Sequence, residues 1–218
     1  MIYIALVDDN DLFRKSLKAY FKQIKRASIL FDAVNGHDLL EQLRTQLRLP
    51  DIILMDFSMP VLDGRQATEK VKKLYPDIKV IVLSMFHHDH LISSMISAGA
   101  KGFLSKNIEA ENLERAIHTV MDNKYFIETD NERFEIFDSS TADTKKLCAD
   151  QLIITEKQKQ FLQLNAGGLT YLEIARKMGI SIKTADNYRD MLFKRFNVTN
   201  RVGLAMFAIQ NGLTDILG

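Results

Sequence analysis

Cysteine is nearly absent from this sequence, and long apolar runs are absent altogether. The single cysteine, Cys148, cannot form an intramolecular disulfide, which is typical of proteins in a reducing compartment. No apolar run approaches the roughly 18 residues that a membrane-spanning helix needs. The first ten residues, MIYIALVDDN, lack a basic segment and carry acids directly after their apolar run, unlike a signal peptide. We therefore expect a cytoplasmic protein with no membrane partner.

Basic and acidic residues are present in nearly equal numbers, but they are distributed unevenly along the chain. The net charge is +1. Residues 1–121 hold 16 Lys+Arg and 15 Asp+Glu, a net charge of +1. Residues 122–150 hold 4 Lys+Arg and 8 Asp+Glu, a net charge of −4. Residues 151–218 hold 9 Lys+Arg and 5 Asp+Glu, a net charge of +4. The basic C-terminal third is therefore the part for which nucleic acid is a candidate partner.

Five short apolar runs alternate with five stretches of helical spacing in residues 1–121. The apolar runs cover residues 2–7, 28–34, 52–55, 79–84 and 101–105. This alternation predicts an α/β domain with a doubly wound, five-stranded parallel sheet and helices on both faces. Residues 122–150 have no clear period, and we expect an exposed linker with room for a short structured piece around Tyr125–Ile127.

Polar side chains follow four of the five predicted strands. They are Asp8 and Asp9 after the first strand, Asp56 after the third, Ser84 after the fourth, and Ser105 and Lys106 after the fifth. Parallel strands present their carboxyl ends along one edge, which is where open α/β sheets bind ligands. Each group alone could be a turn former or a solvated side chain. Together, three carboxylates imply a cation, and oxygen ligands without histidine suit Mg²⁺. A lysine and a hydroxyl at the same edge suit a phosphoryl group, which an aspartate can accept.

The segment around Asp56 resembles the phosphoacceptor segment of receiver domains in two-component response regulators. The shared pattern is D-x-x-M-P-x-x-D-G, formed here by Asp56, Met59, Pro60, Asp63 and Gly64. The resemblance covers residues 1–121 and implies a flavodoxin-like fold. It also implies that Asp56 takes phosphate from the phosphohistidine of a sensor histidine kinase.

The same resemblance implies roles for the other strand-end residues. Asp9, Asp56 and the Ser58 carbonyl would bind Mg²⁺, with Asp8 acting through water. Ser84 and Lys106 would contact the phosphoryl group, and Phe103 would be the aromatic switch residue. Many receivers have proline after this lysine, whereas Asn107 follows here, which leaves the isomer of the Lys106–Asn107 bond open.

The stretch FHHDH (86–90) has three histidines within four positions. A partly exposed loop is the favoured interpretation, and a dedicated metal site is the less favoured alternative because nothing else supports its geometry. A pH effect of these histidines is a further alternative.

Residues 151–218 have helical spacing throughout and predict an all-α helix-turn-helix domain. Thr155, Thr170, Ser181 and Asn200 are the expected N-caps, and Gly179 ends the second helix. The segment resembles the DNA-binding domain of LuxR/NarL-type regulators. The matching residues are Gly168, Leu169, Thr170, Glu173, Ile174, Ala175, Met178, Ser181, Thr184, Val198, Asn200 and Arg201.

The third of these helices is the expected recognition helix in the major groove. We expect its apolar side, formed by Ile182, Ala185, Leu192 and Phe196, to be buried. The predicted DNA-binding residues are Lys183, Thr184, Asn187, Tyr188, Arg189, Lys194 and Arg195. Asp186 and Asp190 stand where relatives often carry lysine, and they either narrow base specificity or merely solvate the helix.

These features together predict a phosphorylation-dependent transcription regulator that is not an enzyme. Its partners would be a sensor histidine kinase, double-stranded DNA and a second copy when phosphorylated or DNA-bound. Two alternatives stay open. An aspartyl phosphohydrolase usually needs a second acid two residues after the nucleophile, where Ser58 stands here. A signalling adaptor would use the helical domain to bind protein instead of DNA.

Overall fold

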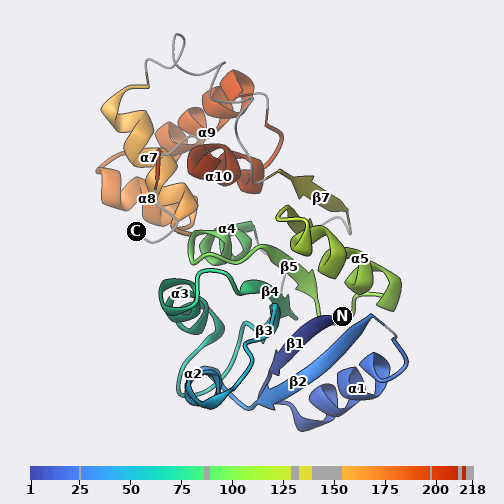
Figure 1. Cartoon of the computed structure of the whole chain (residues 1–218). Helices are drawn as coiled ribbons and strands as arrows, with labels where there is room; N and C mark the ends of the chain where they lie inside the picture. Colours follow the sequence, from blue (N-terminus) through green and yellow to red (C-terminus); the bar gives the residue numbers. More distant parts are fainter. Residues whose placement is uncertain are drawn as a thin grey trace.

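A sheet of seven strands forms the centre of the N-terminal part (Figure 1). The computed structural model describes residues 1–24, 26–85, 89–128, 133–138, 154–196, 198–210 and 213–214. The strands are β1 (Ile2–Val7), β2 (Ala27–Ala33), β3 (Ile52–Asp56), β4 (Lys79–Ser84), β5 (Gly102–Ser105), β6 (Tyr125–Glu128) and β7 (Phe134–Phe137). Their order is β2-β1-β3-β4-β5-β6-β7, and only β7 is antiparallel to its neighbour. The five predicted parallel strands are confirmed, and two further strands extend the sheet.

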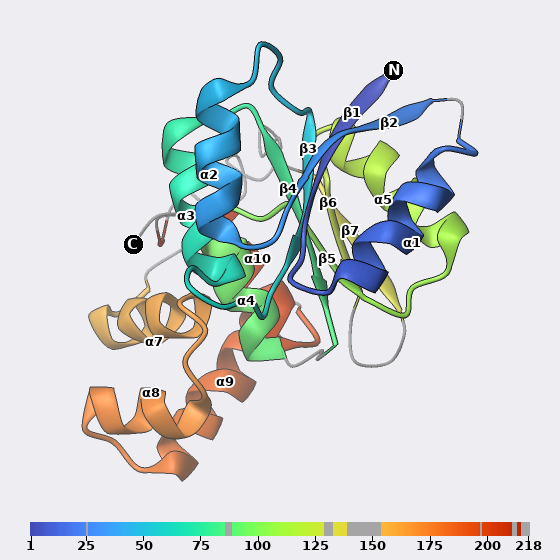
Figure 2. The same cartoon turned by 90° about the horizontal axis from the view of Figure 1, so that it is seen from below.

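Helices cover both faces of the sheet, as Figure 2 shows. They are α1 (Asp11–Phe21), α2 (Gly36–Thr45), α3 (Gly64–Leu74), α4 (Asp89–Ser97) and α5 (Ala110–Met121). Successive residues of a strand point to opposite faces. Ile4 and Leu6 accordingly join the cluster under α1 and α5, while Ala5 and Val7 join the cluster under α2, α3 and α4. The doubly wound architecture is therefore confirmed.

Strands β6 and β7 form an antiparallel hairpin inside the segment predicted to be a linker. Phe126 pairs with Gly102 of β5, so β6 covers what would otherwise be the edge of a five-stranded sheet. The Phe126 and Phe134 ring centroids lie 5.1 Å apart. Lys124 and Asp138 form an ion pair of 3.3 Å at the open end of the hairpin. The structured piece expected around Tyr125–Ile127 is thus a strand, and residues 139–150 lie outside the described part.

The C-terminal part contains four described helices with the predicted caps. They are α7 (Glu156–Ala166), α8 (Tyr171–Met178), α9 (Ile182–Phe196) and α10 (Arg201–Gln210). Thr155 and Thr170 form capping boxes, and Gly179 ends α8 with φ of 65°. The Ser181 hydroxyl accepts from Thr184 N, and Asn200 Oδ1 accepts from Gly203 N. The helix-turn-helix prediction is confirmed.

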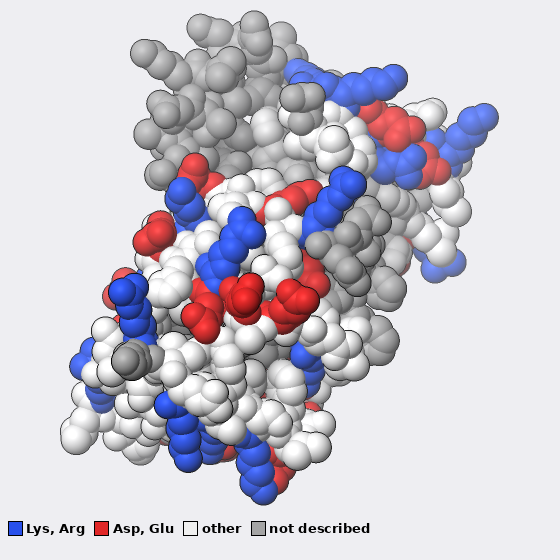
Figure 3. Space-filling view, turned by 90° about the vertical axis from the view of Figure 1, so that its right-hand side faces the viewer, with Lys and Arg blue, Asp and Glu red and all other residues white. Residues whose placement is uncertain are grey.

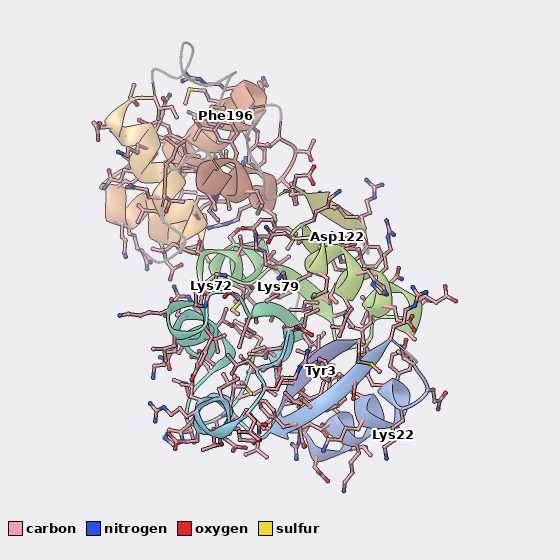
Figure 4. The ribbon with its side chains drawn as sticks, in the orientation of Figure 1. Tyr3, Lys22, Lys72, Lys79, Asp122 and Phe196 are labelled. Atoms are coloured by element: carbon pink, nitrogen blue, oxygen red, sulfur yellow. The ribbon has the colours of Figure 1, made fainter. Side chains whose placement is uncertain are left out.

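The predicted apolar side of α9 is only partly buried. Ala185 and Leu192 are fully buried. Phe196, labelled in Figure 4, stacks on Phe207 of α10 with ring centroids 3.9 Å apart. Ile182 is 50% exposed, so the prediction that it is buried was wrong. As the first residue of α9, it precedes the turns that pack on α8.

The two parts of the chain contact each other through α4. Helices α7 and α10 lie against α4 (Figure 2). Val202, Met206 and Ile209 of α10 belong to the same buried cluster as residues of the N-terminal part. The Ser97 hydroxyl donates to the Ala166 carbonyl at 2.5 Å. None of the described helices combines the length and apolar character needed to span a bilayer.

Candidate phosphoryl site and nucleic-acid interface

Three carboxylates meet beyond the carboxyl ends of β1 and β3. Asp8 follows β1 directly, and Asp56 is the last residue of β3. One oxygen from each of Asp8, Asp9 and Asp56 lies within 4.8 Å of the others. Asp8 and Asp56 are buried, whereas Asp9 is exposed. The expected convergence of these acids is therefore present.

Lys106 neutralises part of this negative charge. Its Nζ lies 2.7 Å from Asp8 Oδ2 and 2.9 Å from Asp56 Oδ2. The Lys106 backbone N–H donates to the Ser84 carbonyl at 2.9 Å, which fixes the start of the side chain. Burial opposes the charged form of Lys106, but its hydrogen bonds to Asp8 and Asp56 outweigh burial and raise its pKa. Lys106 therefore stays cationic in the site.

Asp56 is held in a position where its negative charge is poorly solvated. Burial raises the pKa of Asp56 and the nearby Asp8 charge adds to that rise, although the hydrogen bond from Lys106 opposes it. Asp8 Oδ2 is buried and lies 2.7 Å from Lys106 Nζ. Three carboxylates with one ammonium leave an excess of negative charge, which fits a divalent cation with oxygen ligands.

Tight backbone packing follows Asp56. The Ser58 N–H donates to Asp56 Oδ1 at 3.2 Å, and Gly64 N donates to the Phe57 carbonyl at 3.1 Å. A Cβ atom at Gly64 would lie 2.2 Å from the Asp56 carbonyl oxygen. The Asp63 carboxylate caps α3 by accepting from Gln66 N at 2.8 Å. The glycine in the D-x-x-M-P-x-x-D-G pattern is thus required by the close approach of α3 to the end of β3.

The predicted phosphoryl-contacting and switch residues lie on neighbouring strands. Ser84 is buried at the end of β4, one residue beyond Leu83, which pairs with Asp56. Phe103 is fully buried on β5. The described residues contain no cis peptide bond, so the Lys106–Asn107 bond is trans.

Sequence reasoning missed two residues that hold the backbone of this site. Arg14 of α1 donates through Nη1 to the Asp8 carbonyl at 2.7 Å. The buried Glu128 of β6 accepts from Ser105 N at 2.7 Å, next to Lys106. Arg14 sits at helical spacing from the apolar residues of α1, which was its available signal. Glu128 had no signal because its strand was not predicted.

The outer face of α9 presents several of the predicted DNA-binding side chains. Lys183, Asn187, Lys194 and Arg195 are all exposed. Thr184 is half-buried beside the Ser181 cap. By contrast, Figure 3 shows basic and acidic side chains interspersed on the side of the molecule where α5 and β7 lie. The exposed basic and amide side chains of α9 make its outer face a candidate for contact with nucleic acid.

Two other predicted DNA-binding residues are occupied within the helical domain. Arg189 forms ion pairs with Asp186 at 2.9 Å and with Asp190 at 2.8 Å. The hydrogen bond from Arg189 lowers the pKa of Asp190. The Tyr188 ring stacks on Phe161 with centroids 5.8 Å apart. The two acids thus have a role that sequence reasoning did not weigh, as intrahelical partners of Arg189.

Arg201, one of the residues behind the LuxR-type resemblance, has a structural position. It is only 5% exposed. Its guanidinium donates to the Asn165 carbonyl at 3.1 Å and also to the Leu169 carbonyl. It lies 4.9 Å from the centre of the Tyr171 ring. Arg201 therefore joins α10 to the end of α7 and the start of α8.

The side chains of the three histidines in FHHDH lie outside the described residues, and so does Cys148.

Comparison with known proteins agrees with both halves of this architecture. Residues 4–118 match the response regulator receiver domain family, and residues 152–208 match the LuxR family of bacterial regulatory proteins. The response regulator UvrY of Escherichia coli (strain K12) is 30% identical over 215 residues, covering 99% of this chain and 97% of that protein. The response regulator GacA of Pseudomonas aeruginosa is also 30% identical over 215 residues, covering 99% of both chains.

A solved structure supports the fold over nearly the whole chain. RcsB from Salmonella enterica serovar Typhimurium, bound to a promoter with a phosphomimetic, has a TM-score of 0.54 and 20% identity. The match covers 96% of this chain and 98% of that one. With a receiver in residues 4–118, a LuxR-type domain in residues 152–208 and relatives similar along both, this chain belongs to the LuxR-type two-component response regulators, which are phosphorylation-dependent transcription regulators.

Proposed function

We propose that Asp56 is the phosphoryl acceptor and that its modification controls DNA binding by α9. The observation that carries this proposal is the convergence of Lys106 Nζ on Asp56 and Asp8, at 2.9 and 2.7 Å. A lone structural ion pair needs one carboxylate, whereas this ammonium faces two, with a third carboxylate close by. This excess of acids is what a site for a cation and a phosphoryl group requires.

In the proposed reaction, an Asp56 carboxylate oxygen attacks the phosphorus of a phosphohistidine on a sensor histidine kinase. The O–P bond forms, the P–N bond breaks, and the histidine ring leaves with the bonding pair and takes up a proton. Lys106 and Ser84 bind the transferred oxygens. Asp9, Asp56 and the Ser58 carbonyl would hold Mg²⁺, with Asp8 acting through water, and the ion would supply charge neutralisation. The role is that of a regulator and not of a multiple-turnover enzyme.

The proposed output is binding of double-stranded promoter DNA in the cytoplasm. Lys183, Lys194 and Arg195 are exposed on α9 and would contact phosphates. Asn187, exposed on the same face, can pair with an adenine edge. Thr184, Tyr188 and Arg189 are further candidates, although Tyr188 stacks on Phe161 and Arg189 pairs with Asp186 and Asp190. A homodimer bound to two half-sites supplies the affinity that one small domain lacks.

Labelling by a small phosphodonor tests the acceptor. Asp56→Asn should abolish covalent phosphorylation, because the amide oxygen is a poor nucleophile and leaves no acyl phosphate. Asp77→Asn, which changes an exposed acid elsewhere in the receiver, should label like the parent. Mass spectrometry of intact protein, with Mg²⁺ present or chelated, gives the readout. Unchanged labelling of Asp56→Asn would refute the assignment.

A further inference from the structure

We propose that the β6–β7 hairpin couples the phosphoryl site to the DNA-binding domain, with Glu128 positioning the backbone that presents Lys106 and Glu135 holding the start of α10. The inference rests on the proposed phosphorylation switch and adds a route by which it acts. Two hydrogen bonds carry it, one made by Glu128 of β6 and the other by Glu135 of β7.

The first hydrogen bond reaches the phosphoryl site. Glu128 is the last residue of β6 and is 8% exposed. Its Oε2 accepts from the Ser105 N–H at 2.7 Å. Lys106, the next residue, contacts both Asp8 and Asp56. A hydrogen bond to a buried carboxylate is among the stronger kinds, so Glu128 restrains the peptide from which the Lys106 side chain extends.

The hairpin itself can transmit a displacement because it is short and well packed. Glu128 pairs with Phe134, and Ile127 pairs with Glu135, so the two acids lie one residue apart along the ladder. The Phe126–Phe134 ring contact at 5.1 Å packs the strands, and Ile127 is fully buried against the sheet. Close-packed elements of this kind transmit strain instead of absorbing it.

The second hydrogen bond reaches the DNA-binding domain. Glu135 Oε1 accepts from Asn200 Nδ2 at 2.7 Å. Asn200 also caps α10, because its Oδ1 accepts from Gly203 N at 2.7 Å. Helix α10 in turn packs its apolar face on α4. Glu135 therefore holds the residue at which the docked helix begins.

The switch then has two arrangements. In the docked arrangement, Glu135 holds Asn200 and α10 lies on α4, which fixes the helical domain to its own receiver. A phosphoryl group on Asp56 draws Lys106 away from Asp8, shifts Ser105, and weakens the hold of the hairpin on Asn200. A released domain can adjust its position to match the half-site spacing of a dimeric DNA site. Phosphorylation and DNA binding consequently favour each other.

A matched pair of variants at Glu135 tests the hydrogen bond between Asn200 and Glu135. Glu135→Ala removes the acceptor, whereas Glu135→Gln keeps an oxygen that can accept from Asn200. Without phosphodonor, Glu135→Ala should bind promoter DNA about three- to tenfold more tightly than the parent, as expected for loss of one hydrogen bond that favours the docked form. The ratio of affinities with and without phosphodonor should fall by the same factor. Glu135→Gln should behave like the parent, and so should Asp138→Asn, which changes another acid of the hairpin.

Because phosphorylation and DNA binding favour each other, the labelling rate of Asp56 is a second measurement. A purely structural role of Glu135 would not change this rate. Glu135→Ala should also speed the labelling of Asp56 by a small phosphodonor, because it favours the released arrangement that phosphorylation favours. Glu128→Ala should alter the labelling rate, and Glu128→Gln should restore it. In the double variant Glu128→Ala/Glu135→Ala, the affinity ratio should be no lower than in the more affected single variant, because both residues act on one route.

The outcomes separate the two proposals. Normal labelling of Asp56 with an unchanged affinity ratio in Glu135→Ala would overturn the coupling role and leave the switch intact. Strictly additive effects in the double variant would also overturn it. Failure of the parent protein to label at Asp56 would instead refute the proposed function.

Discussion

At the scale of single residues, Asp32 shows how α1 is tied to the sheet. The Arg14 Nε lies 3.1 Å from Asp32 Oδ2, and Lys18 pairs with the other carboxylate oxygen. Burial opposes ionisation of Asp32, but the hydrogen bonds from Lys18 and Arg14 outweigh it and lower the pKa of this carboxyl. The folded protein therefore favours the ionised form more than the unfolded chain does.

We expect Asp32→Asn to lower the free energy of unfolding by about 1 kcal/mol at pH 7. Because the folded pKa lies below the unfolded value of about 3.9, this contribution is complete above about pH 5. It is lost as the pH falls through the folded pKa, so the gap between parent and variant should close in acid. Urea unfolding of both proteins at pH 7 and pH 3 measures the gap. A gap that widens in acid would contradict the ion-pair explanation.

The charges of α9 give a second residue-scale prediction. Lys194→Ala should weaken binding to specific and non-specific DNA alike and reduce the salt slope by about 1, because one phosphate contact is lost. Asp190→Asn should strengthen non-specific DNA binding, since it removes a negative charge from the face of α9 that would contact the DNA phosphates. Lys159, exposed on α7, provides a control through Lys159→Ala. Fluorescence anisotropy at several salt concentrations reads out the slopes, and a parent-like slope for Lys194→Ala would place this residue off the DNA.

At the scale of elements, the start of α3 is fitted closely to the end of β3. A Cβ atom at Gly64 would lie 2.2 Å from the Asp56 carbonyl oxygen and 2.9 Å from Phe57 Cα, both of them backbone atoms. Gly64→Ala should therefore cost about 1–3 kcal/mol, as overpacking typically does. It should also slow phosphodonor labelling by displacing Asp56.

Gly167→Ala is the matched control for that glycine change. Its Cβ would approach no atom closer than 3.4 Å, and Gly167 has φ of −66°. Thermal unfolding and labelling rates of the two variants should separate clearly. Equal stability of both alanine variants would show that α3 can shift freely away from β3.

The same element scale explains which parts of the fold could be predicted. The first five strands carry runs of branched apolar residues that need two covered faces, so their sequence alone indicates parallel strands. The hairpin strands YFIE and FEIF have four residues each and lie within a stretch dominated by polar residues. Their pairing depends on β5 already offering an edge, which is tertiary information. The partial exposure of Ile182 has a similar origin, because helical periodicity does not reveal where a neighbouring helix ends.

At the scale of the whole molecule, the docking of α10 on α4 decides how the two domains move. Met206 is 1% exposed within the cluster that α10 shares with the receiver. Met206→Ala should weaken this contact by leaving a cavity. We expect a larger radius of gyration in small-angle X-ray scattering and faster amide exchange in α4.

Leu204 provides the control for that change. It is fully buried, but in the separate cluster that forms the core of the helical domain. Leu204→Ala should destabilise the helical domain without speeding amide exchange in α4. If Met206→Ala kept the parent's dimensions and exchange rates, α10 would not be what holds the domains together.

The phosphoryl site could be predicted from sequence alone, whereas the contact between the two domains could not. Asp8, Asp56 and Lys106 could be brought together by topology, because parallel strands deliver their ends to one edge. The contact of Glu135 with Asn200 joins residues 65 positions apart in two different domains. No periodic pattern specifies such a pair, since it depends on how the two domains are placed relative to each other.

The antiparallel hairpin also bears on the construction of hybrid regulators. A receiver cut at residue 121 and fused to a foreign output module would lose β6, which would leave the outer edge of β5 unpaired while β4 still pairs with its other edge. A junction placed after Asp138 would keep the native edge of the sheet, with Glu128 still bonded to Ser105. Hybrids joined at the earlier point should therefore aggregate or signal poorly for reasons unrelated to the module attached.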